Sequence, residues 1–137
     1  MMSSLVAAIG FTACGQKIDA SKVPAAVKAN FAKKYPGASV KWEKEDDKFE
    51  AGFKQNGNTM SALFEANGTM TESEKAVKVS QLPVAVLNYI KVHYKGKNIK
   101  EAAQITRADG TVNYEAEVNG KDVIFDAGGN FLKETKD

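Results

Sequence analysis

Apolar residues recur along the chain with two spacings, and this pattern occurs twice. Steps of three and four residues predict a helix that begins near Ser21–Pro24 and ends before Pro36. Alternation of apolar and polar residues then predicts four antiparallel strands, over residues 40–44, 49–53, 59–66 and 69–76. The second half predicts the same order, with a helix over 83–94 and strands over 99–106, 111–118, 121–127 and 130–134.

The two halves also match residue by residue. Val23-Pro24-Ala25-Ala26-Val27 returns as Leu82-Pro83-Val84-Ala85-Val86, at an offset of about 59 residues. We therefore expect two copies of one unit, over residues 21–77 and 78–137. A chain of about 60 residues buries too little surface to be stable alone, so the halves are expected to need each other for folding.

The first residues have a different character. Residues 3–13 carry no charge, are too short to span a bilayer, and end at Cys14. The motif Phe11-Thr12-Ala13-Cys14 resembles a bacterial lipobox. We expect a lipoprotein signal peptide over residues 1–13, lipid on Cys14 and a polar tether over residues 14–20. The alternative is an apolar tail with a free thiol.

Charge narrows the range of partners. The chain has 19 basic and 17 acidic residues, for a net charge of +2, and Arg107 is its only arginine. Nucleic-acid binding proteins usually carry a clustered basic face with arginines for bidentate contacts. The sequence therefore argues against a nucleic-acid partner.

Several motifs, most of them present in both copies, together resemble one protein family. They are the Val/Leu-Pro-x-x-Val helix start, the aromatic-x-Gly helix end at Tyr35 and Tyr94, the strand Val40-Lys41-Trp42, and the core strands Phe49-Glu50-Ala51 and Tyr114-Glu115-Ala116. Over residues 22–133 the chain resembles the PepSY-like family of exported, beta-lactamase-inhibitor-like bacterial domains. The resemblance implies an α+β fold whose tandem units form one curved sheet with the helices on one face. It implies no catalytic residue.

Candidates for catalysis and metal binding are few. His93 is the only histidine, and we expect it on a solvated helix face because its counterpart in the first copy is Lys34. An acidic hairpin at Glu43, Glu45, Asp46 and Asp47 lacks the ligand spacing of a calcium loop. An enzyme, or a protein that binds metal or a small molecule through His93 and this hairpin, stays as an alternative. We expect no enzymatic activity, no metal and no cofactor.

The face of the sheet away from the helices is the candidate binding surface. Alternation places Glu50, Lys54 and Glu117 on that face, and Trp42 is a further candidate. We expect an exported periplasmic or outer-membrane lipoprotein, held to the membrane through Cys14, that binds a protein or peptide of the cell envelope. Inhibition of that partner is the narrower hypothesis, and a structural lipoprotein without a ligand is the other alternative. Exposed aromatic residues on the face would favour binding, whereas an unbroken pattern of lysine and glutamate would favour the structural lipoprotein.

Overall fold

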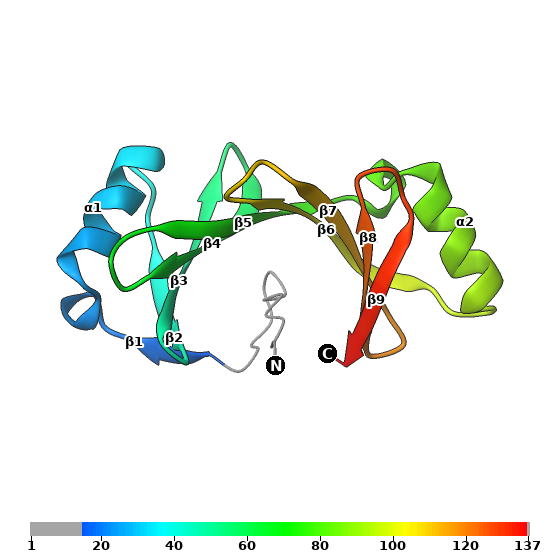
Figure 1. The fold of residues 1–137 in the computed structure, drawn as a ribbon, viewed down its shortest axis with the longest axis horizontal. Coiled ribbons are helices and arrows are strands. Elements are labelled where there is room, and N and C mark those ends of the chain that lie inside the picture. The colour runs from blue at the N-terminus through cyan, green and yellow to red at the C-terminus, as the bar shows by residue number, and fades with distance from the viewer. Residues whose placement is uncertain (1–14, 137) are drawn as a thin grey trace. The chain divides into compact units, whose positions relative to one another are not determined.

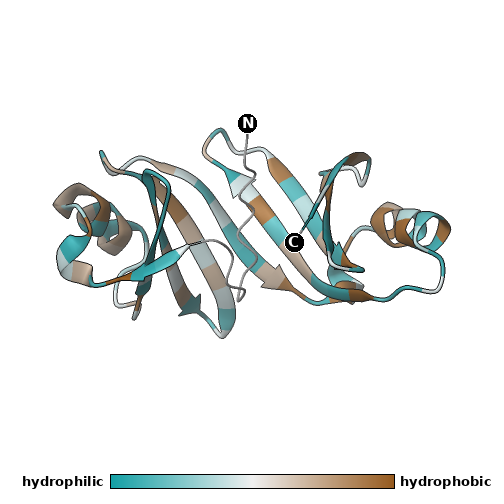
Figure 2. Cartoon of the chain, turned by 90° about the horizontal axis from the view of Figure 1, so that it is seen from below, coloured by the Kyte–Doolittle hydropathy of each residue, from teal (hydrophilic) through white to brown (hydrophobic). Residues whose placement is uncertain are grey.

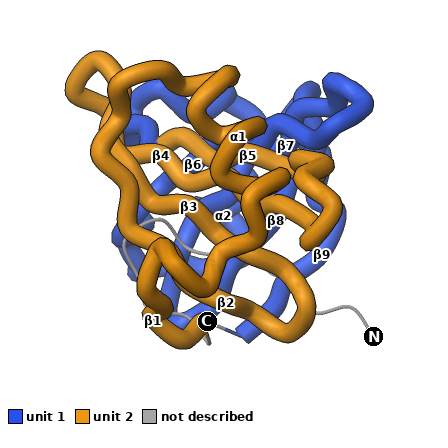
Figure 3. Tube along the Cα trace, turned by 90° about the vertical axis from the view of Figure 1, so that its left-hand side faces the viewer, with its two compact units in different colours: residues 1–4, 76–137 blue, residues 5–75 orange. Residues whose placement is uncertain are grey.

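The computed structural model describes residues 15–136, which form two compact units that divide near residue 75 (Figure 3). We refer to them as the N-terminal unit and the C-terminal unit. Each combines one α-helix with antiparallel strands that follow one another in sequence order (Figure 1). The α+β class predicted from the sequence is therefore confirmed. The joining of the two sheets into one curved sheet stays a prediction.

The N-terminal unit contains one strand more than predicted. Its elements are β1 (Gln16–Ile18), a 3-10 helix (Ala20–Lys22), α1 (Ala25–Lys34), β2 (Lys41–Glu45), β3 (Lys48–Gln55), β4 (Asn58–Glu65) and β5 (Met70–Val77). Residues 16–18 were expected to belong to a polar tether, but they pair antiparallel with β2, with Ile18 opposite Trp42. This pairing with a neighbouring strand, rather than an alternating pattern of its own, accounts for β1.

The C-terminal unit repeats the helix and the four strands. Its elements are a 3-10 helix (Val79–Gln81), α2 (Val84–His93), β6 (Ile99–Arg107), β7 (Val112–Val118), β8 (Lys121–Asp126) and β9 (Phe131–Lys136). Both helices end in the same way, because the backbone N–H of Tyr35 or Tyr94 donates to a carbonyl of the last turn at 2.8 Å. The two helices therefore end at equivalent residues, although Lys95 stands where the first copy has Pro36.

Aromatic rings fill the core of the N-terminal unit. Phe31 projects from α1, and its ring centroid lies 5.0 Å from that of Phe53 and 5.6 Å from that of Trp42. The strands supply further buried side chains, of which Phe64 is fully buried. Figure 2 shows hydropathy alternating along the strands, which is why only one face of each strand enters this core.

Aliphatic residues take a larger share of the second core. Val86 and Ile90 of α2 are buried against the strands, together with Val118 and Phe125. Val86 and Ile90 stand 59 positions after Val27 and Phe31. Equivalent helix positions of the two copies are therefore buried in the two cores. Phe53 of β3 and its counterpart in the second copy, Val118 of β7, are likewise both buried.

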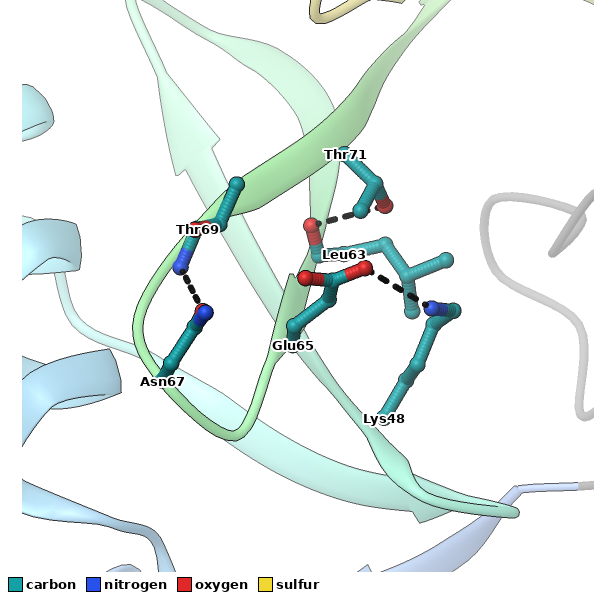
Figure 4. Close-up of polar contacts among 6 residues, drawn as sticks. All are labelled: Lys48, Leu63, Glu65, Asn67, Thr69 and Thr71. Atoms are coloured by element: carbon teal, nitrogen blue, oxygen red, sulfur yellow. Dashed lines mark hydrogen bonds and ion pairs between the residues drawn. The ribbon is translucent and has the colours of Figure 1, made fainter.

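A glycine turn packs against the start of each helix. Gly68 follows β4 with φ of +96°, and its neighbour Asn67 accepts a hydrogen bond from the backbone N–H of Thr69 at 2.9 Å (Figure 4). A Cβ on Gly68 would lie 2.8 Å from the carbonyl oxygen of Ala26. The equivalent turn glycine of the second unit, Gly129, approaches Ala85 in the same way. Close approach therefore requires glycine at both turns, in addition to the positive φ.

We expect Gly68→Ala to destabilise the protein more than Gly57→Ala. Both glycines have positive φ, but a Cβ on Gly57 meets no atom within 4 Å, so this control measures only the backbone cost of about 1 kcal/mol. Gly68→Ala should cost about 1 to 3 kcal/mol more, because backbone atoms of α1 must shift. Urea denaturation of the two variants makes the comparison, and equal losses would contradict the packing argument.

Candidate functional site

No helix of the N-terminal unit covers the face of its sheet that points away from α1 (Figure 1). We call this surface the helix-free face. Strand alternation and register place on it the side chains of Lys41, Glu43, Glu45, Lys48, Glu50, Lys54, Ser61, Leu63, Glu65, Glu72 and Glu74. The surface is therefore dominated by carboxylates.

Three of these carboxylates gather where β2 pairs with β3. Glu43 lies directly opposite Glu50 in the register, and Glu45 is two residues further along β2 on the same face. We call Glu43, Glu45 and Glu50 the β2–β3 acidic cluster. Like charges placed directly opposite each other destabilise a strand pair, so packing alone does not account for the arrangement.

Two lysines of the β2–β3 hairpin, Lys44 and Lys48, direct their charges away from the cluster. Lys48 is opposite Glu45 in the register, but its Nζ lies 3.6 Å from Oε2 of Glu65 on β4 (Figure 4). Lys44 points to the other face, donates to the carbonyl oxygen of Asp46 at 2.6 Å, and lies 5.6 Å from the centroid of the Phe49 ring. Lys44 and Lys48 therefore do not neutralise the cluster, whereas Lys17 of β1 lies opposite Glu43 and Lys41 of β2 shares its face.

Burial and mutual repulsion act together on the cluster. Burial, followed by the charges of Glu45 and Glu43, raises the pKa of Glu50 to about 8, against a smaller lowering by a hydrogen bond with Ser61. Burial also raises the pKa of Glu45, and Glu43 adds to the shift. The side chain of Glu45 is 7% exposed, and its Oε1 atom makes no hydrogen bond. The site thus holds a buried acceptor without a donor, among carboxylates that are difficult to ionise together.

The C-terminal unit carries acidic residues on the corresponding face, but basic residues accompany them. Glu101, Glu115, Glu117 and Asp122 point away from α2. Lys100 Nζ lies 4.0 Å from Oε2 of Glu117, and Arg107 Nε donates to Oδ1 of Asn113 at 3.0 Å. The two copies therefore differ in the electrostatics of this face.

The residues predicted for the site are partly brought together. Glu50, Lys54 and Glu117 do point away from the helices, as predicted. Only Lys54 is exposed, however, because Glu50 is half-buried and Glu117 is buried. Their expected exposure is corrected for these two residues.

Trp42 does not belong to the helix-free face. Its side chain lies in the core against Phe31 and Phe64 and is 5% exposed, so packing accounts for it. No aromatic side chain lies on the helix-free face of β2 to β5, so the expected mark of a binding surface is missing there. Cys14 lies outside the described residues.

The sequence also left open an alternative site built on His93. His93 is exposed at the end of α2, where its ring stacks on Tyr89 with 3.9 Å between centroids. Tyr89 also stacks on Phe131 of β9, at 5.0 Å. Within residues 15–136, no three His, Cys, Asp or Glu side chains are arranged to hold a metal ion. No helix in this part of the chain is long and apolar enough to cross a membrane.

Solved structures with the same fold come from Bacteroides species. A "BLIP-like protein" of Bacteroides fragilis is 25% identical, with a TM-score of 0.69 and coverage of 82% of this chain and 86% of that one. A DUF2874 family protein of Bacteroides uniformis is 20% identical, with a TM-score of 0.74 and coverage of 82% and 88%. A "putative periplasmic" protein of Bacteroides eggerthii is 16% identical, with a TM-score of 0.76 and coverage of 83% and 88%.

The comparison with models of protein families agrees with the internal repeat of the sequence. Among curated proteins, none matches the chain. The model of the family described as "Putative beta-lactamase-inhibitor-like, PepSY-like" matches twice, over residues 12–71 and 47–133. These two overlapping matches cover most of the sequence and include both helix-plus-strand units. The chain therefore belongs to the PepSY-like family of beta-lactamase-inhibitor-like proteins.

Proposed function

We propose that the protein is an exported, non-catalytic binding module that holds a protein or peptide of the cell envelope on its helix-free face. The observation that carries this proposal is the β2–β3 acidic cluster, which places Glu43, Glu45 and Glu50 together on a face that no helix of the unit covers. Charge of one sign concentrated on a protein surface steers and selects partners of opposite sign. Such a surface suits recognition.

Export and anchoring form part of the same proposal. The apolar run before Cys14 is the pattern of a lipoprotein signal, and lipid on Cys14 would hold the module at a membrane. The Bacteroides eggerthii neighbour is described as a "putative periplasmic" protein, and this supports export. A narrower form of the proposal is that the protein inhibits the partner that it binds. The "BLIP-like" description of the Bacteroides fragilis neighbour supports this form. This support is fold analogy.

Photo-crosslinking in intact cells tests the docking face. A photoreactive amino acid is placed in the full chain at Lys54, which is exposed on the helix-free face, and separately at Lys34, which is exposed on α1. We expect a discrete protein adduct from position 54 and none from position 34. Glu43→Lys combined with Glu50→Lys should remove the adduct, whereas Lys33→Glu on α1 should leave it unchanged.

The same experiment separates the alternatives. Adducts from position 34 alone would place the partner on the helix side and overturn the proposal. No adduct from either position would favour a structural lipoprotein without a ligand. His93→Ala should not change the adduct, since His93 stacks on Tyr89 of its own helix and joins no catalytic set among residues 15–136. Loss of the adduct in this variant would favour a site built on His93.

A further inference from the structure

The β2–β3 acidic cluster has features that favour one kind of occupant. Glu45 Oε1 is a buried hydrogen-bond acceptor without a donor, and buried acceptors of this kind are costly to leave unpaired. Glu43 and Glu50, on adjacent strands, add two further carboxylates to the same surface. A group that both donates hydrogen bonds and carries positive charge would satisfy the acceptor and relieve the repulsion.

We infer that the β2–β3 acidic cluster receives lysine or arginine side chains from a basic segment of the polypeptide that docks on the helix-free face. This inference rests on the proposed function and names the chemistry of its partner. Ammonium and guanidinium groups carry several donors and remain charged near neutral pH. Charge-assisted hydrogen bonds to carboxylates are among the strong ones in proteins.

A polypeptide segment fits the cluster better than other cations. Glu43 and Glu45 are two residues, about 6.6 Å, apart on β2, and Glu50 lies opposite Glu43, so the carboxylates have the spacing of alternate side chains of an extended peptide. No three acidic or histidine side chains of residues 15–136 form a metal site. Anionic lipid and nucleic acid would be repelled by this face. Successive basic side chains of a peptide can reach carboxylates at such spacings.

The surroundings of Glu50 couple such binding to a proton. The charged and polar groups around it are Lys41, Glu43 and Glu45 from β2, Ser61 and Glu65 from β4 and Glu72 from β5, with Lys48 and Lys54 on its own strand. Because its pKa is about 8, Glu50 is mostly protonated at neutral pH, and a bound cation would favour the ionised form. Binding should therefore release a proton and strengthen as pH rises from 6 to 8.5.

Isothermal titration calorimetry with a defined probe tests the inference. The probe is a blocked peptide of four Lys-Ala pairs, titrated into the full chain at pH 6, 7.5 and 8.5, with phosphate and Tris buffers compared at pH 7.5. We expect affinity at least about tenfold higher at pH 8.5, and a heat at pH 7.5 that differs between buffers because a proton is released. Glu50→Gln should abolish both effects, Glu43→Gln should weaken binding but keep them, and Glu101→Gln on exposed β6 should behave as the unmodified chain.

Other outcomes would overturn the inference. Equal weakening by Glu50→Gln and Glu101→Gln would mean general attraction to acidic protein surface. Equally tight binding of spermine would make a small polyamine, and not a polypeptide, the occupant. No binding of the peptide, together with persistent photo-adducts at position 54, would refute the basic segment while the proposed function stands. If the peptide does not bind and no photo-adduct forms at position 54, the proposed function is refuted as well.

Discussion

Replacing Glu50 with glutamine is expected to raise the free energy of unfolding by a few kcal/mol above pH 8 and to change it little near pH 4.5. Glu50 has a pKa of about 8 in the folded protein, against an ordinary value of 4.5. Between these values the unfolded chain loses the proton first, so the folded state binds more protons. Stability then falls as pH rises, by at most about 1.4 kcal/mol per pH unit from this group. Glutamine removes that component.

Urea denaturation at pH 4.5, 6.5 and 8.5 measures the effect as a difference between variant and unmodified protein. The difference is the informative quantity, because other carboxylates such as Asp126 have lowered pKa values and contribute the opposite slope in acid. Glu101→Gln removes the same charge from an exposed position and is the matched control. A pH-independent difference for Glu50→Gln would mean that Glu50 is ionised without strain in the folded protein.

The helices and most strands could be predicted because local patterns and global packing agree. Val27 and Phe31 lie one turn apart on α1, and both enter the core, as their spacing predicted. β1 could not be predicted in this way. Its three residues, Gln16–Ile18, show no lasting alternation, and pairing with β2 accounts for them. Secondary structure that depends on a partner strand leaves little trace in the local sequence.

Only part of the β2–β3 acidic cluster could be predicted from the sequence. Alternation already placed Glu50 on the face away from the helices, and Glu43 was part of the predicted acidic hairpin, but their pairing depends on the connection between β2 and β3. Only Asp46 and Asp47 separate the paired residues Glu45 and Lys48, which sets Glu43 opposite Glu50. Counting outward from this two-residue turn would have found the pair. The burial of Glu45 and Glu117 could not be read in this way, because it depends on residues from several strands.

The strongest losses of stability are expected from matched positions of the two helices, Phe31→Ala in α1 and Ile90→Ala in α2. Phe31 contacts the rings of Tyr35, Trp42, Phe53 and Phe64, and Ile90 is buried in the second core. Cavity formation should cost about 3 to 5 kcal/mol for Phe31→Ala and about 2 to 5 kcal/mol for Ile90→Ala. Val92→Ala, at a position of α2 that is 61% exposed, is the control and should be nearly neutral.

Fluorescence of Trp42 makes the pair of variants informative about cooperativity. Trp42 is the only tryptophan and lies in the core of the N-terminal unit, whereas Ile90 belongs to the C-terminal unit. Since a unit of about 60 residues is marginal alone, we expect Ile90→Ala to lower the urea midpoint seen by Trp42 as well as that seen by circular dichroism. A Trp42 transition that stays in place while the circular dichroism transition splits would show that the units unfold independently. The duplication would then have joined two self-sufficient domains, not two halves of one cooperative fold.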